Sequence, residues 1–152
     1  DATGRTAAHT GSACIDWCGH VSGDGFSVSG NMLAGKDVIE DTAAAYLANL
    51  SAPFPQRLIA AMLAGEAAGG DKRGKQSAAL LIHGEEAWSD LDLRVDDHAD
   101  PLAERDRLER MSRTHWMVFR RFLPSHRDRV GVTDRRVIEA AILEAQRATE
   151  QS

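Results

Sequence analysis

Alternating apolar and polar positions open the chain, and longer helical patterns follow them. Residues 13–20 and 26–33 flank a glycine-containing reversal at residues 21–25, which predicts a β-hairpin. Residues 5–10 are predicted to form a further strand. Residues 1–4 combine Asp and Gly without an apolar run, and we interpret them as a hairpin turn whose first strand is absent.

Two helices are predicted next, because apolar residues recur every three or four positions in residues 37–50 and 55–68. Asp37 is the expected N-cap of the first helix, and Pro55 suits the start of the second. The expected core positions of the pair are Ile39, Ala43, Tyr46, Leu47, Leu50, Leu58, Ile59, Met62 and Leu63. Gly69 and Gly70 are expected to end the second helix.

The second half of the chain repeats this order of strands and then helices. Residues 76–83 form a nearly continuous apolar run, which predicts a strand buried on both faces, whereas residues 91–97 alternate as a half-exposed strand does. Asp100 and Pro101 predict the start of a helix that extends to about residue 123, and a last helix is expected at 133–149. The pattern favours a layered α+β protein with a helix pair lying across sheet.

Composition excludes two classes of partner. The chain has 152 residues and a net charge of -5, and its acidic excess lies before residue 98, so we expect no nucleic-acid partner. No apolar run approaches the roughly 20 residues that span a membrane, and we expect no membrane partner. The two cysteines, Cys14 and Cys18, indicate a reducing, cytoplasmic location; a disulfide between them would need a turn.

Four segments, in their order and spacing, resemble the bacterial domain-of-unknown-function 1028 family. They are Ala8-His-Thr-Gly11 with Cys14-Ile-Asp-Trp17; Gly30-Asn-Met-Leu33; Gly69-Gly-Asp-Lys-Arg-Gly-Lys-Gln-Ser-Ala-Ala-Leu-Leu81; and Asp92-Leu-Arg-Val-Asp-Asp-His98, followed by Pro101. The resemblance covers about residues 1–110. Residues 111–152 resemble nothing familiar and are expected to be a helical extension. Cys18 also departs from the family pattern, which favours a small residue such as Ala there.

The resemblance implies an α+β fold like that of the N-terminal-nucleophile (Ntn) hydrolases, in which two sheets pack face to face between layers of helices. It implies a hydrolase of amide-type bonds acting on a small-molecule or peptide-like substrate, without a cofactor. This chain then matches the C-terminal part of the family domain. Because Asp1 has no nucleophilic hydroxyl or thiol, we expect the nucleophile on a missing N-terminal segment or a companion chain, and this chain alone to be inactive.

Three residues are candidates for a catalytic role. Asn31 follows a strand and would donate its amide to an oxyanion, although a turn-forming Asn fits the same position. Thr10 lies beside His9 at a strand end and would line the pocket. Asp96 shares one strand face with Asp92 and Arg94, an arrangement that also fits a structural ladder of ion pairs.

Five residues are candidates for substrate binding: Arg73, Gln76, Ser77, Arg94 and His98. The first three lie between a glycine-rich turn and a strand. This turn would either form a substrate lip, meaning the rim of a substrate-binding site, or be a plain solvated turn. Arg94 would receive a substrate carboxylate as a bidentate fork. His98 would form an acid/base pair with Asp97, or both would belong to a turn that caps the next helix.

Two other classes of function stay open. The absent nucleophile also fits a non-catalytic Ntn-like module for binding or assembly, and an apolar stripe at Trp116, Phe119, Phe122 and Leu123 suits a core or a homo-oligomer face. A thiol or zinc site at Cys14, Cys18 and His20 is a weaker alternative, because a fourth zinc ligand is not evident. We therefore predict no metal.

Overall fold

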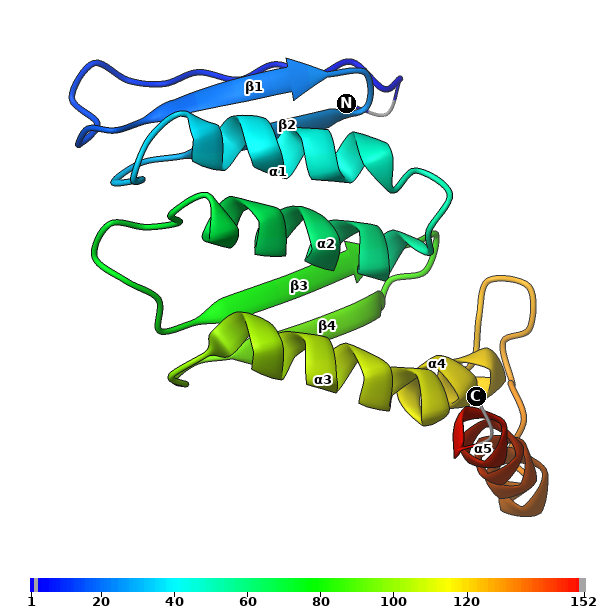
Figure 1. The fold of residues 1–152 in the computed structure, drawn as a ribbon. Coiled ribbons are helices and arrows are strands. Elements are labelled where there is room, and N and C mark those ends of the chain that lie inside the picture. The colour runs from blue at the N-terminus through cyan, green and yellow to red at the C-terminus, as the bar shows by residue number, and fades with distance from the viewer. Residues whose placement is uncertain (2, 151–152) are drawn as a thin grey trace. The chain divides into compact units, whose positions relative to one another are not determined.

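The protein is an α+β chain in a computed structural model that describes residue 1 and residues 3–150 (Figure 1). This confirms the predicted α+β class. The chain divides into two compact units, Asp1–Gln76 and Ser77–Ser152, which are described separately below. The predicted domain boundary at residue 110 stays a prediction.

A two-stranded antiparallel hairpin, β1 (Gly19–Gly23) and β2 (Phe26–Gly30), opens the first unit. The hairpin confirms the prediction, but its turn is only Asp24-Gly25, with Gly25 at a φ of 71°. β1 begins six residues later than predicted and extends into the predicted reversal, β2 ends three residues earlier than predicted, and residues 5–10 form no strand. That segment is instead bound to β1 through its side chains, since Thr6 Oγ1 donates to the Gly23 carbonyl at 3.0 Å.

Helices α1 (Asp37–Ala48) and α2 (Phe54–Ala67) follow as predicted, each ending slightly early. The predicted cap was wrong: Asp37 lies inside α1, and Lys36 precedes it without a side-chain cap bond. Gly69 and Gly70 end α2 with φ angles of 118° and 54°, a conformation that favours glycine.

The buried face of α2 is rotated from the predicted one. Ile59 is buried as expected, but Met62 and Leu63 are exposed, while Ala61 and Gly65 are buried. Small residues allow the two helix backbones to approach closely: a Cβ on Gly65 would lie 2.2 Å from Thr42 Oγ1 of α1. Apolar periodicity alone could not identify this face, because it ranks large side chains above Ala and Gly.

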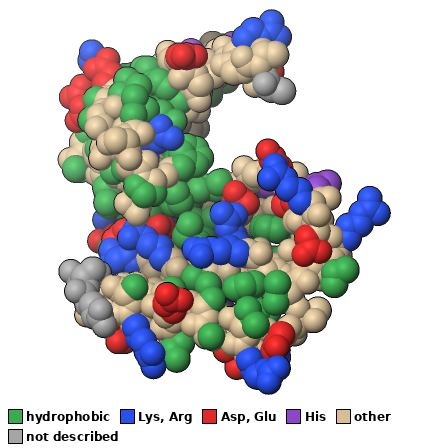
Figure 2. Space-filling model, turned by 90° about the vertical axis from the view of Figure 1, so that its right-hand side faces the viewer, with side chains coloured by type: hydrophobic (Ala, Val, Ile, Leu, Met, Phe, Trp, Pro, Cys, Tyr) green, Lys and Arg blue, Asp and Glu red, His purple; other side chains and the backbone are tan. Residues whose placement is uncertain are grey.

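Apolar side chains also remain at the surface, where Figure 2 shows them among charged ones. In the two helices of the first unit the exposed ones are Leu47, Phe54, Met62 and Leu63, with Leu50 in the connection.

The second unit contains the antiparallel pair β3 (Ala78–His83) and β4 (Ser89–Val95), with an irregularity between Ile82 and His83. The alternation predicted for β4 is confirmed, since Leu91 and Val95 are buried between exposed acidic and basic residues. The burial predicted for both faces of β3 was wrong: Leu80 is 6% exposed but Leu81 is 56% exposed. A continuous apolar run therefore does not distinguish a strand buried on both faces from one with an open face.

Helix α3 (Pro101–Thr114) begins as predicted, with the Asp100 side chain accepting the Ala103 N–H at 3.2 Å. The expected single helix to residue 123 was wrong, because the backbone leaves helical geometry at His115. A short helix α4 (Trp116–Phe119) and a 3₁₀ turn η1 (Arg120–Phe122) follow. The break turns Trp116 so that its indole N–H donates to the Asp90 carbonyl at 2.9 Å. Helix α5 (Arg135–Glu150) lies close to the predicted 133–149.

Candidate functional site

The hairpin of the first unit has one apolar and one polar face. On the apolar face, the ring of Phe26 lies 5.1 Å from that of Tyr46 in α1. On the other face, directly opposed residues carry polar side chains, His20 opposite Ser29 and Ser22 opposite Ser27. Opposed residues of an antiparallel pair project to the same side of the sheet, so these side chains form one polar surface.

Thr10 is held on this polar surface by His20. Its Oγ1 lies 2.7 Å from His20 Nδ1, within hydrogen-bond distance. A hydroxyl in contact with an imidazole is the minimal arrangement for proton transfer, and it also serves to fix both side chains in place. The sequence indicated Thr10 as a pocket residue but did not pair it with His20, because the two lie in different segments.

Asn31 follows β2 directly, in a bend before Met32, which has a φ of 56°. Its side chain is exposed and its amide makes no hydrogen bond within the described part of the chain. The backbone after it is held firmly: Met32 N–H donates to the Ile15 carbonyl at 3.1 Å, and Lys72 N–H donates to the Met32 carbonyl at 2.9 Å. The amide therefore projects from a fixed backbone, and its role at an oxyanion stays a prediction.

The side chain and backbone N–H of Arg73 both form hydrogen bonds to Asp71 in the same turn. Its Nε donates to Asp71 Oδ1 at 2.9 Å, its NH2 donates to Oδ2 at 2.6 Å, and its backbone N–H donates to Oδ1 at 2.8 Å. Gln76 ends the first unit and Ser77 begins the second; both are exposed and lie outside helices and strands. The substrate lip predicted for these residues stays a prediction, with Arg73 already paired.

Arg73 should make the Asp71 carboxyl unusually acidic. Hydrogen bonds from its side chain and backbone lower the pKa of Asp71 to about 2. Since this pKa is depressed in the folded state, the stabilisation is present above the unfolded pKa of about 3.9 and is lost as pH falls toward 2. We expect carbon-detected NMR titration to place Asp71 near 2 and Arg73→Gln to return it toward the usual value. An unchanged Asp71 titration in that variant would contradict the assigned cause.

The remaining sequence candidates lie in the second unit. Arg94 NH2 donates to Asp96 Oδ1 at 2.9 Å, and both side chains are exposed. The hydrogen bond to Asp96 and the negative charges of Asp96 and Asp92 raise the pKa of Arg94. This geometry favours the ladder of ion pairs among the two interpretations. His98 Nδ1 accepts the Asp100 N–H at 2.9 Å, which places it in the turn that caps α3.

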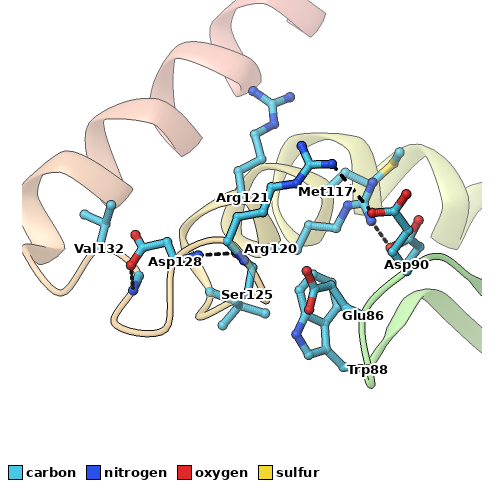
Figure 3. A pocket seen from close by; sticks show the side chains of 13 residues that line it. Glu86, Trp88, Asp90, Met117, Arg120, Arg121, Ser125, Asp128 and Val132 are labelled. Carbon is cyan, nitrogen blue, oxygen red and sulfur yellow. Dashed lines mark hydrogen bonds and ion pairs between the residues drawn. The ribbon is translucent and has the colours of Figure 1, made fainter.

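A cavity of about 540 Å³ in the second unit was not foreseen from the sequence (Figure 3). Its charged lining is largely paired: Arg120 binds Asp90, and Glu86 Oε2 lies 2.6 Å from His126 Nδ1 while both Glu86 oxygens accept the His126 backbone N–H at 3.2 Å. Because Glu86 and His126 are 40 positions apart, no local pattern connects them. Trp88, Met117, Leu123 and Val132 supply its large apolar side chains.

Two further observations concern other chemistries. Among the described residues, no group of three or more His, Cys, Asp or Glu side chains is arranged to hold a metal ion. No described helix has the length and apolar character needed to cross a membrane.

Comparison with known proteins places the chain in a family. Residues 1–105 match the family of unknown function DUF1028. The crystal structure of protein SPO2555 from Silicibacter pomeroyi, of the same family, is similar over 88% of this chain, with 33% identity and a TM-score of 0.76. The match spans 57% of that protein's chain. No curated protein matches the sequence. The chain therefore belongs to the family of unknown function DUF1028.

Proposed function

We propose that this chain is part of an Ntn-type hydrolase of amide-like bonds, whose nucleophile is carried by residues outside this sequence. The proposal rests on the family resemblance of the motif segments and on one structural observation. At the end of the hairpin, the Asn31 amide projects from a fixed backbone without a hydrogen-bond partner among the described residues, and the Thr10–His20 pair occupies the polar face of the same hairpin.

Each candidate has a proposed role that its geometry permits. Asn31 donates its amide to the oxygen that becomes negative as the substrate amide is attacked. Thr10 and His20, 2.7 Å apart, orient one another and present a hydroxyl to a small-molecule or peptide-like substrate. In the second unit, Asp96 stays a proposed catalytic residue, and Ser77, Arg94 and His98 stay proposed substrate contacts. In the first unit, Arg73 and Gln76 stay proposed substrate contacts.

The test uses the full-length protein that contains this chain and a panel of small amides and peptides. We expect Asn31→Ala to lower kcat about a hundredfold with little change in KM, because an oxyanion donor acts on the transition state. Asp41→Ala is the control, since Asp41 is an exposed residue of α1 in the same unit and has no proposed role. Absence of turnover by the full-length protein, or equal kcat in Asn31→Ala and the parent, would overturn the proposal.

A second candidate is a non-catalytic module for binding or self-assembly. It is favoured by the exposed apolar side chains of the first unit, among them Leu50 (56% exposed) and Leu47 (48% exposed). This candidate predicts concentration-dependent association in analytical ultracentrifugation, reduced in Leu47→Ser/Leu50→Ser, together with no amide turnover. A strictly monomeric protein would remove the homo-oligomer version.

A further inference from the structure

The segment between the two cysteines is folded back and held at every intervening residue. Met32 N–H donates to the Ile15 carbonyl at 3.1 Å, and Leu33 N–H donates to the Trp17 carbonyl at 3.0 Å. The carbonyl between them, that of Asp16, accepts from Lys72 Nζ. All three bonds come from residues outside the segment, so its shape is set by the surrounding unit.

This shape brings Cys18 to Cys14. A fully extended strand would separate the two Cα atoms by about 13 Å, far beyond the reach of a disulfide. Here Cys18 Sγ lies 4.0 Å from the Cys14 carbonyl oxygen, because the chain bends at residues 14, 16 and 17. The turn that a disulfide between these positions requires is therefore present.

The two thiols differ in their access to solvent. Cys14 is exposed, whereas Cys18 is half-buried beside Trp17, whose ring packs over Gly19. Burial raises the pKa of the Cys18 thiol, and the neighbouring Cys14 and Asp16 raise it further. A small-molecule disulfide in solution would therefore react first with the Cys14 thiol. The less accessible Cys18 thiol would then react with the resulting mixed disulfide.

We propose that Cys14 and Cys18 are a thiol–disulfide exchange site that forms a reversible intramolecular disulfide at the expense of a small-molecule disulfide. The Cys14 thiolate attacks one sulfur of the oxidant, forming a mixed disulfide and releasing one small thiolate. The Cys18 thiolate then attacks Cys14 Sγ, forms the Cys14–Cys18 bond and releases the second small thiolate. Two protein thiols are oxidised, one disulfide is reduced, and both thiol protons pass to the released thiolates. The inference is independent of the proposed hydrolase activity.

The test equilibrates the chain with glutathione and glutathione disulfide, then alkylates remaining thiols and measures the intact mass. Since Cys14 and Cys18 are the only cysteines, we expect two alkyl groups on the reduced chain and none on the oxidised monomer. Cys18→Ala should instead hold one glutathione at Cys14, because the resolving thiol is gone. Covalent dimers, or two bound glutathiones per chain, would overturn the proposal.

A second measurement tests whether disulfide formation depends on the folded geometry or only on the short distance between the two cysteines in sequence. We expect the equilibrium constant for disulfide formation to fall at least about tenfold in urea, a rise in reduction potential of about 30 mV, because the bonds holding residues 15–17 are lost. Lys72→Met, which removes the bond to the Asp16 carbonyl, should shift the constant in the same direction. Equal constants in the folded and unfolded chain would show that the structure contributes nothing, and would overturn the proposal.

Discussion

Arg113→Ala is expected to lower the free energy of unfolding by about 3–5 kcal/mol, because it leaves a buried carboxylate without its counter-charge. Glu109 is 1% exposed, and Arg113 Nε lies 3.0 Å from each of its carboxylate oxygens. Both residues lie on α3, one turn apart.

Urea unfolding followed by tryptophan fluorescence measures the effect, since Trp88 and Trp116 both lie in the second unit. The control is Arg107→Ala on the same helix. Its partner Glu104 is 25% exposed, and the loss of such a surface pair should be below about 1 kcal/mol. The double variant Glu109→Met/Arg113→Met should recover most of the stability, because it removes the charge as well as its partner. Equal losses in Arg113→Ala and Arg107→Ala would contradict the assigned burial.

Leu91→Ala should lower the free energy of unfolding by about 2–5 kcal/mol, through lost apolar burial and the cavity left behind. Leu91 is 2% exposed and lies opposite Ile82 in the β3–β4 pair. Leu81→Ala is the matched control, because the same side chain in the neighbouring strand is 56% exposed. That change should stay within about 0.5 kcal/mol. Similar unfolding midpoints for the two variants would contradict the assignment of the faces of β3 and β4.

Local patterns predicted most of the elements, and the errors have identifiable causes. The hairpin, β4 and the Asp100 cap depend on neighbours in sequence, so turn residues and alternation predict them. The end of α3 at His115 depends on Trp116 reaching Asp90, a contact between segments 26 positions apart. The buried face of α2 depends on how closely α1 approaches Gly65, which the residue pattern of α2 alone does not contain.

The candidate site was predicted to a smaller extent. The sequence indicated Thr10, Asn31 and Arg73 but not their partners. Thr10 contacts His20 and Arg73 contacts Asp71, whereas the Asn31 side chain has no hydrogen-bond partner among the described residues. The Asp71–Arg73 contact joins near neighbours, whereas Thr10 meets His20 only after the hairpin has formed. Motif spacing thus identifies polar residues without showing which of them form hydrogen bonds or ion pairs with one another.

A protease that cut the chain near residue 115 would remove more than a terminal appendage. Beyond that point, the Trp116 indole and the Arg120 guanidinium both return to Asp90 of β4, and Val118 is 2% exposed. A fragment ending where the family match ends, at residue 105, would lose these contacts and expose the end of β4 to solvent exchange. Mutations in the tail beyond residue 105 can therefore alter the part of the chain that matches the family. The matched part and the tail should be expressed together, and they should also be compared together between species.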